Sequence, residues 1–332
     1  MRICVFSDYI GIKDEGLRNI AFHLCRELSK RHELLRQCLK PSKRLFSISF
    51  WRRIKDFDPH IIHYIPGPTI KSFMIVRALK ICCPQAKTVM SATCPGLSAF
   101  SKRFVPLLKP DLILTQSQKS EQMFANLGCK VRFLPSGVDT ERFAPVTEAA
   151  VKHALRMKYG LNGEKPIVLH VGHITKRRNV LILNELQREG RVQILLVGNL
   201  SIPLDQEVYE SLIKCGSVVL EVYFRNIEEI YALSDCYIFP VTNPTGCIEM
   251  PLSVMEAMSC NLPVITTRFG ALPRVFKEGD GLLYVEKKGE FKELLNVLIN
   301  GGSNIRNREK VLPYCWERIA NKLEQIYEEI LF

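Results

Sequence analysis

Two carboxylates and a serine stand around the start of one expected helix. Glu249 and Ser253 precede the helix-forming run 254–260 and Glu256 lies within it, and this run lies between the apolar segments 236–241 and 264–267. In a parallel α/β sheet this order places such side chains at the carboxyl edge of the strands, where ligands bind. The first N–H groups of a helix lack partners within the helix and attract anions. The stretch therefore predicts an anion-binding site flanked by carboxylates.

A second group of polar residues follows the apolar run 166–172. Gly172 and His173 lead into three consecutive cations, Lys176, Arg177 and Arg178. Arginine can pair two phosphate oxygens at once, so a cation cluster after a strand suits a diphosphate. A solvated turn is the structural alternative.

Elements that could position these residues alternate as strand and helix along the chain. Residues 2–7 form an expected buried strand, a polar loop follows, and residues 17–30 keep a helical period. Gly16, at the end of that loop, could let its N–H approach a phosphate, or it could simply make a tight turn. Further strands are expected at 60–65, 87–91, 110–115, 130–133, 193–198, 217–222 and 282–285, and helices at 70–82, 117–127, 146–163, 226–233 and 314–331. This alternation is typical of doubly wound α/β domains.

Three segments carry a resemblance to a known family. Residues 256–259 read Glu-Ala-Met-Ser and are followed by Pro-Val-Ile-Thr-Thr at 263–267, residues 134–145 read LPSGVDTERFAP, and the run 166–179 ends in the cation cluster. Together they resemble the family-4 retaining glycosyltransferases, also called glycosyl transferases group 1, of the GT-B fold. The resemblance implies an α/β protein with two Rossmann-like doubly wound domains that face each other across a cleft, and a C-terminal helix that crosses back to the first domain.

The resemblance also implies domain limits and a reaction. We expect an acceptor-side domain over residues 1–145, a nucleotide-sugar-binding domain over 146–312, and a terminal helix over 313–332 that packs on the first domain. The enzyme would be a hexosyltransferase that moves a hexose from a UDP- or GDP-linked sugar to a lipid-linked or saccharide acceptor. It would retain the anomeric configuration and use neither a metal nor a cofactor, because the nucleotide-sugar is a substrate.

Roles for individual residues follow from the same resemblance. Glu256 would hold the ribose hydroxyls, and Glu249 would contact the donor hexose; these two are the catalytic candidates. Glu228 and Tyr231 stand where the family lines its base pocket. The residues expected to bind the donor diphosphate and sugar are Gly16, Gly172, His173, Lys176, Arg177, Arg178, Leu252 and Ser253.

Several positions depart from the family pattern. Six residues separate Glu249 from Glu256, where the family usually has seven, and Ile248 occupies the usual place of the first glutamate. Pro251 replaces a common glycine, and His173 replaces an arginine. The strand over 87–91 ends without the histidine that the family often has there, so Ser91 and Thr93 are left to hydrogen-bond the sugar. These departures leave open a catalytically weakened GT-B subunit that binds a nucleotide or a partner protein. A GT-B epimerase fits less well, because its histidine and glutamate arrangement is absent.

The positive charge is confined to the N-terminal part of the chain. The formal net charge is +12, and residues 1–150 hold 24 Lys and Arg against 12 Asp and Glu, whereas the remainder holds 22 of each kind. Within residues 26–55, ten cations stand among apolar and aromatic side chains. Such a segment suits an anionic membrane surface or a phosphorylated acceptor; a solvated basic loop and a nucleic-acid site are the alternatives. The expected docking residues are Lys43, Arg44, Phe46, Trp51, Arg52 and Arg53.

Other features exclude several classes of protein. No signal peptide is evident, and no apolar run reaches the length that spans a bilayer, so we expect a cytoplasmic protein, possibly peripheral on the cytosolic face of the membrane. The twelve cysteines show no Cys-x-x-Cys spacing, which favours reduced thiols over zinc or disulfide sites. Asp56 and Asp58 resemble a metal-binding Asp-x-Asp, but Pro59 indicates the end of a helix and the turn into a strand.

Overall fold

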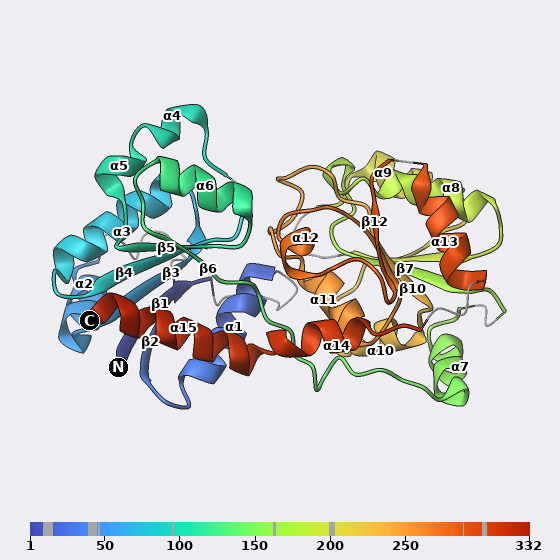
Figure 1. Cartoon of the computed structure of the whole chain (residues 1–332), viewed down its shortest axis with the longest axis horizontal. Coiled ribbons are helices and arrows are strands. Elements are labelled where there is room, and N and C mark those ends of the chain that lie inside the picture. Colours follow the sequence, from blue (N-terminus) through green and yellow to red (C-terminus); the bar gives the residue numbers. More distant parts are fainter. Residues whose placement is uncertain are drawn as a thin grey trace. The chain divides into compact units, whose positions relative to one another are not determined.

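A computed structural model describes residues 1–8, 16–38, 45, 47–94, 96–161, 164–198, 203–287, 289–300 and 304–332, without the side chains of 299 and 300. The chain divides into two compact units (Figure 1). Unit 1 contains Met1–Gly137, Ile248–Met250 and Trp316–Phe332, and unit 2 contains Val138–Cys247 and Pro251–Cys315. The division after Gly137 falls inside the segment 134–145, eight residues before the expected limit at 145.

Unit 1 is built on a six-stranded sheet in which every pairing is parallel. Its strands, in spatial order, are β2 (Glu33–Cys38), β1 (Arg2–Ser7), β3 (Ile61–Gly67), β4 (Lys87–Ala92), β5 (Leu112–Thr115) and β6 (Val131–Phe133). The inner strands are buried on both faces, as parallel strands covered by helices require. The carboxyl ends of these strands therefore lie along one edge of the sheet.

Helices cover both faces of this sheet (Figure 1). They are α1 (Gly16–Leu28), α2 (Ile48–Phe57), α3 (Ile70–Cys82), α4 (Ala99–Lys102), α5 (Val105–Leu108), α6 (Gln118–Asn126) and α15 (Trp316–Leu331). Apolar residues of α2, α3, α5 and α6 form one core with the sheet, and α1 packs with α15 on the opposite face. Unit 1 is thus doubly wound, as the sequence predicts.

Unit 2 repeats the same plan with a second six-stranded parallel sheet. Its strands, in spatial order, are β12 (Leu282–Val285), β11 (Val264–Thr267), β10 (Cys236–Phe239), β7 (Ile167–Val171), β8 (Gln193–Val197) and β9 (Val218–Leu220). The order reverses between β7 and β10, and a doubly wound sheet binds ligands at such a switch point.

The helices of unit 2 also lie on both faces of their sheet (Figure 1). They are α7 (Ala149–Lys158), α8 (Leu183–Arg188), α9 (Gln206–Lys214), α10 (Ile227–Leu233), α11 (Leu252–Ser259), α12 (Leu272–Val275), α13 (Glu290–Asn300) and α14 (Asn307–Val311), with 3₁₀ turns η2 (Lys176–Arg178), η3 (Val180–Ile182) and η4 (Leu312–Tyr314). The core on one face consists of residues from α8, α9 and α13 packed on the strands. Two units of this design form the GT-B fold.

The segment 26–55 is more regular than the sequence indicates. It contains a complete edge strand, β2, in register with β1, and the amphipathic helix α2, which buries Phe50 and Ile54. Helix α2 ends at Phe57, and Asp58 adopts a left-handed conformation with φ of 47°. Asp58 thus lies at the end of a helix, as Pro59 indicates. Its carboxylate pairs with Arg2 at 2.7 Å.

The last helix, α15, belongs to unit 1 and is held there by a buried polar chain. The Tyr327 hydroxyl lies 2.6 Å from Nδ1 of His63 on β3, and Nε2 of His63 lies 2.8 Å from the Ser91 hydroxyl on β4. His63 is fully buried, and this burial lowers its pKa from 6.5 to about 3. The imidazole is therefore neutral in the folded protein at neutral pH.

This buried histidine makes stability depend on pH. Its pKa is lower in the folded chain than in the unfolded one, so its contribution is present above about pH 6.5 and is lost as the pH falls toward 3. Between about pH 7.5 and about pH 5, His63→Gln should lose about 2 kcal/mol less of its unfolding free energy than the wild type. Urea unfolding at both pH values measures this difference. The same change at exposed His153 is the control, and equal pH dependence in wild type and His63→Gln would contradict the account.

Candidate active site

Arg178 is a buried cation at the carboxyl end of β7. Its side chain is 7% exposed, and its nearest polar neighbour is Nδ1 of His173, 3.5 Å from Nη2. Its Nε atom is buried and has no hydrogen-bond partner. Within the part of the chain that the structure describes, no carboxylate pairs with this guanidinium. Because a buried unpaired charge costs several kcal/mol, the arrangement calls for an anion.

Gly172 gives Arg178 the space that it occupies. Gly172 has a φ of +153°, a conformation that side chains rarely adopt. A Cβ atom at this position would lie 2.9 Å from Nη1 of Arg178 and 3.4 Å from Nε2 of His170. The predicted residues Gly172, His173 and Arg178 are thus brought together.

His170, on β7, lies beside this group and was not singled out by the sequence. Its Nδ1 lies 2.9 Å from the carbonyl oxygen of Ile238, and its Nε2 has no partner. Burial, with the nearby charge of Arg178, lowers its pKa from 6.5 to about 4. A neutral His170 with Nδ1–H bonded to Ile238 turns a lone pair toward the Arg178 side of the strand. The only sequence signal for it is one polar residue within an apolar strand.

The N-terminus of α11 reaches the same group of residues. The helix starts at Leu252 after Pro251, and no side chain caps it, so its first N–H groups remain available. Ser253 lies beside the Tyr237 hydroxyl, and the charge of Arg178 also acts on Tyr237. Leu252 is buried at the helix start. The helix N-terminus, Ser253 and Arg178 can together stabilise an anion.

Glu256 lies one turn further along α11, within a second polar group. Its Oε2 accepts a hydrogen bond of 2.7 Å from the hydroxyl of Tyr231 on α10. Burial raises the pKa of the carboxyl, and Arg142 opposes that effect. Arg142 also pairs with Glu228 at 2.7 Å. The other carboxylate oxygen of Glu256 remains able to accept hydrogen bonds from ligand hydroxyls, and the predicted neighbours Glu228 and Tyr231 are indeed close.

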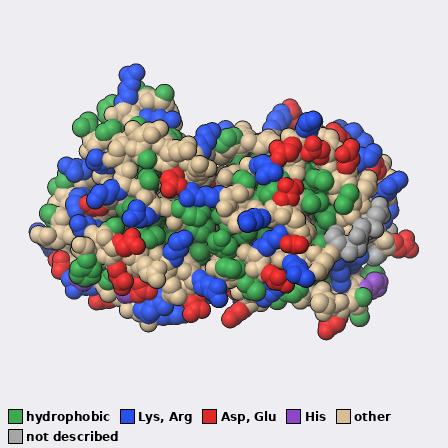
Figure 2. All heavy atoms as spheres, in the orientation of Figure 1, with side chains coloured by type: hydrophobic (Ala, Val, Ile, Leu, Met, Phe, Trp, Pro, Cys, Tyr) green, Lys and Arg blue, Asp and Glu red, His purple; other side chains and the backbone are tan. Residues whose placement is uncertain are grey.

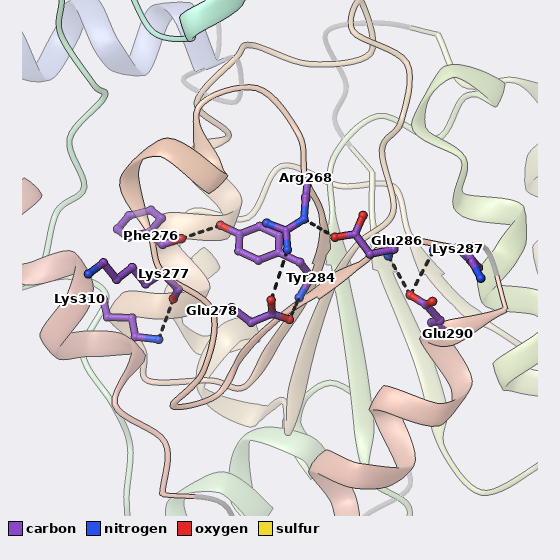
Figure 3. Close-up of polar contacts among 9 residues, drawn as sticks. All are labelled: Arg268, Phe276, Lys277, Glu278, Tyr284, Glu286, Lys287, Glu290 and Lys310. Atoms are coloured by element: carbon purple, nitrogen blue, oxygen red, sulfur yellow. Dashed lines mark hydrogen bonds and ion pairs between the residues drawn. The ribbon is translucent and has the colours of Figure 1, made fainter.

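Of the other cations of unit 2 near the strand ends, Lys176 and Arg268 are paired with carboxylates and Arg177 is exposed. Lys176 is exposed and pairs with Glu207 at 2.5 Å, and Arg177 is exposed. Arg268 follows β11 and pairs with Glu286 and, at 3.4 Å, with Glu278 (Figure 3).

Figure 3 also shows the other contacts of this network, beyond the ends of β11 and β12. The guanidinium of Arg268 lies 4.8 Å from the centre of the Tyr284 ring, and the Tyr284 hydroxyl donates to the carbonyl oxygen of Phe276 at 3.0 Å. Glu290 accepts from the N–H groups of Glu286 and Lys287, and Lys310 donates to the carbonyl oxygen of Lys277. These contacts are structural, which leaves Arg178 as the cation of this edge best placed to meet a ligand.

Glu249 belongs to unit 1, where its side chain is bonded to two serines. It is 3% exposed, and one carboxylate oxygen accepts hydrogen bonds from Ser117 at 2.8 Å and from Ser120. Its backbone N–H donates to the carbonyl oxygen of Thr93 at 2.7 Å. Burial raises the pKa of this carboxyl, and the two serines oppose the effect. Glu249 therefore holds residues 248–250 at the N-terminus of α6.

Other predicted residues of unit 1 have structural neighbours. Gly16 begins α1, and a Cβ atom there would lie 2.9 Å from Cδ1 of Ile248. Ser91 is bonded to His63, so a histidine does lie near the end of β4, although it comes from β3. The sequence reveals it only as a polar residue within the apolar strand 60–65.

The expected docking residues divide into three groups. Trp51 is half-buried against the core of unit 1 and donates from its ring N–H to the carbonyl oxygen of Leu45 at 2.8 Å. Arg52 and Arg53 are exposed on α2. Lys43, Arg44 and Phe46 lie outside the described residues. In that described part, no group of three or more His, Cys, Asp and Glu side chains is placed to hold a metal ion, and no helix there has the length and apolar character to cross a bilayer.

Comparison with known families agrees with this geometry. Residues 165–300, which carry Arg178 and α11, match the family described as Glycosyl transferases group 1. This segment of the chain is therefore similar to group 1 glycosyltransferases, and the resemblance read from the sequence is confirmed.

Curated relatives match at low identity. Spore coat protein SA of Bacillus subtilis (strain 168) is 25% identical over 235 residues, which are 62% of this chain and 60% of that protein. A GDP-mannose-dependent alpha-(1-6)-phosphatidylinositol monomannoside mannosyltransferase of Mycolicibacterium smegmatis is 28% identical over 185 residues, 51% of this chain and 47% of the relative. The chain thus spans about half to three-fifths of the length of these relatives.

Solved structures confirm the fold over the whole chain. Anabaena HepE in complex with UDP and glucose superposes with a TM-score of 0.77 at 14% identity, covering 99% of this chain and 100% of that one. Sucrose-phosphate synthase from Thermosynechococcus elongatus gives a TM-score of 0.79 at 16% identity, covering 99% and 98%. The two-domain GT-B fold expected from the sequence is confirmed.

The space beside Gly172 should be essential for ligand binding. In Gly172→Ala, the new Cβ atom would displace the guanidinium of Arg178, and we expect the affinity for UDP or GDP to fall at least about tenfold, or about 1.4 kcal/mol. Calorimetric titration measures the affinity. Gly190→Ala is a matched control, because Gly190 also has a positive φ of +70° but no atom lies within 4 Å of its Cβ position. Equal affinities of the two variants would contradict the assignment.

The carboxyl of Glu249 should act on stability through its serine partners. Glu249→Ala leaves the Ser117 and Ser120 hydroxyls without their acceptor and should cost about 1–3 kcal/mol of unfolding free energy. Glu249→Gln keeps an acceptor oxygen and should cost less than about 1 kcal/mol. Denaturant unfolding distinguishes them, with exposed Glu141→Ala as the control. If Glu249→Ala unfolds like the wild type, the anchoring role is wrong.

Proposed function

We propose that this protein is a hexosyltransferase that uses a nucleotide-sugar donor. The observation that carries the proposal is the buried guanidinium of Arg178, which lacks a carboxylate partner among the described residues and lies beside Gly172 and the N-terminus of α11. A departing nucleoside diphosphate concentrates negative charge on its phosphates. Pre-placed donors and cations stabilise such charge in a transition state, so they can drive the transfer without a protein nucleophile.

The polar group around Glu256 would bind the ribose of the donor. Glu256, fixed by Tyr231, can accept hydrogen bonds from ribose hydroxyls, and Arg142 with Glu228 borders that position. Ser253, Leu252, Gly172 and His173 would surround the diphosphate. Lys176 and Arg177 are exposed, so they would contact the diphosphate only after their side chains move.

Relatives and neighbours support a nucleotide-sugar in kind. HepE was solved with UDP and glucose, and the mannosyltransferase is named as GDP-mannose-dependent. By analogy we propose a UDP- or GDP-linked hexose as donor, a lipid-linked or saccharide acceptor, and a role in glycan biosynthesis. Retention of configuration and independence from metal ions and cofactors follow the same analogy, since Arg178 and the N–H groups of α11 can supply the positive charge.

A second candidate is a GT-B subunit that binds the nucleotide but transfers little. The position of Glu249 motivates it, because one oxygen of this carboxylate accepts from Ser117 and Ser120, and among the described residues the other oxygen is buried without a hydrogen-bond partner. Ile248 occupies the place where the family usually has its first glutamate. Incubation with UDP- and GDP-sugars and a panel of lipid-linked and saccharide acceptors separates the two candidates. A transferase forms glycoside and releases the nucleoside diphosphate, whereas a binding subunit gains thermal stability from the nucleotide but forms no product.

Two substitutions test the assignment of the donor site. Arg178→Gln and Glu256→Ala each remove a charge-assisted hydrogen bond, worth about 1.5–3 kcal/mol, so each should weaken donor binding about tenfold or more. The affinity for the sugar nucleotide that gives the largest thermal shift is the measurement. Arg268→Gln is the control, because that cation is already bound to Glu286 and Glu278 (Figure 3). Unchanged donor affinity and turnover in Arg178→Gln or Glu256→Ala would refute the role of that residue.

A further inference from the structure

Helix α3 of unit 1 carries an exposed stripe in which cations and large apolar side chains alternate. Lys71, Met74, Arg77 and Ile81 recur at intervals of three, three and four residues, which places them on one face of the helix. Met74 is 58% exposed and Ile81 is 69% exposed, whereas the opposite face is buried in the core. In the described part of unit 1, most of the surface of these two apolar side chains is open to solvent.

Helices α4 and α5, in the connection from β4 to β5, add a second set of such residues. Phe100 is 67% exposed, Phe104 is 40% exposed and Leu107 is 74% exposed. The two phenylalanine rings contact each other edge to face, with centroids 5.2 Å apart. Helix α5 packs against α3, so the two sets lie on neighbouring helices. We define the lipid-facing surface as Lys71, Met74, Arg77, Ile81, Phe100, Lys102, Arg103, Phe104 and Leu107.

The charge of this surface has one sign. Residues 59–110 contain seven Lys and Arg and no Asp or Glu. Of these cations, Lys80 pairs with Asp111 at 3.2 Å, just beyond the segment. Among the residues with described positions, no carboxylate pairs with Lys71, Arg77, Lys102 or Arg103. The cations of the lipid-facing surface are therefore not neutralised by the protein itself.

Figure 2 shows part of this surface at the upper left, over α4 and α5. Hydrophobic side chains and Lys or Arg side chains are visible there among other atoms. Exposed aromatic rings beside cations that lack carboxylate partners suit the headgroup region of an anionic bilayer, where the rings enter the interface and the cations meet lipid phosphates.

We propose that α3, α4 and α5 dock unit 1 on an anionic lipid surface. A protein partner fits less well, because the centres of protein interfaces are depleted in lysine and charge, whereas cations alternate with apolar residues throughout this surface. Nucleic acid fits less well because Phe100 and Phe104 pack edge to face with each other, whereas binding of a single strand uses rings that stack on bases. Exposed Arg52 and Arg53 on neighbouring α2 extend the same charge.

This inference deepens the proposed function by naming the surface at which a lipid-linked acceptor would be met. Vesicle binding involves no transfer, so the two proposals fail separately. If the protein transfers a sugar but does not bind vesicles, only the lipid-facing surface is refuted. If it binds vesicles but transfers no sugar, only the proposed reaction is refuted.

Sedimentation with vesicles tests the docking surface. The full chain should bind vesicles of phosphatidylcholine and phosphatidylglycerol, should bind pure phosphatidylcholine at least tenfold more weakly, and should lose affinity as salt rises. The triple variant Phe100→Ser, Phe104→Ser, Leu107→Ser should bind the anionic vesicles at least tenfold more weakly. A matched control replaces three exposed apolar residues of unit 2, Met157, Ile213 and Val297, with serine, and it should bind like the wild type.

A charge variant makes the test independent of the apolar substitutions. Lys102→Gln with Arg103→Gln should weaken binding to anionic vesicles at least threefold and reduce its salt dependence, and both side chains are at the surface, so the fold should persist. Failure of the wild type to bind anionic vesicles would overturn the proposal. So would binding by the triple variant or the charge variant that equals the wild type, or binding of random RNA in place of vesicles.

Discussion

The buried charge of Arg178 is the constraint on which the functional half of this molecule depends. A guanidinium taken out of water usually has a carboxylate partner, and here the described neighbours are His173, the neutral His170, a glycine and a tyrosine. Such a charge can be kept only where the remaining stability of the fold offsets it and a ligand later compensates it. The opposite holds for Lys176 and Arg268, whose charges are already paired at the surface.

Parallel strands explain why these residues meet although they are distant in the sequence. Gly172 and Arg178 follow β7, and α11 follows β10, its neighbour in the sheet. Both strands end at the same edge, and the chain order reverses between them, which is where doubly wound sheets bind ligands. At the corresponding edge of the sheet in unit 1, the carboxylate has a structural role. There Glu249, carried on a segment of only three residues, caps α6 through Ser117 and Ser120.

Much of this arrangement could be predicted from the sequence, because it depends on local pattern. Alternating strands and helices identify doubly wound sheets, and the run of cations after Gly172 together with Glu256 predicts a donor side that stays a prediction. The choice of Arg178 over Lys176 could not be predicted, since it depends on which side chain the backbone buries beside a glycine. The position of Glu249 was missed for a similar reason: its two serine partners are more than 120 residues away in sequence. His63 was missed because its partners come from β4 and the last helix.

The central claim is that Arg178 is held without a counter-ion until a diphosphate binds. Thermal unfolding of the wild type and of Arg178→Met, each with and without UDP or GDP, tests it most directly. Without ligand, Arg178→Met should be at least as stable as the wild type, because it removes a buried unpaired charge while keeping most of the side-chain volume. With ligand, the melting temperature of the wild type should rise and that of Arg178→Met should not. A less stable Arg178→Met protein that still responds fully to the nucleotide would contradict the account.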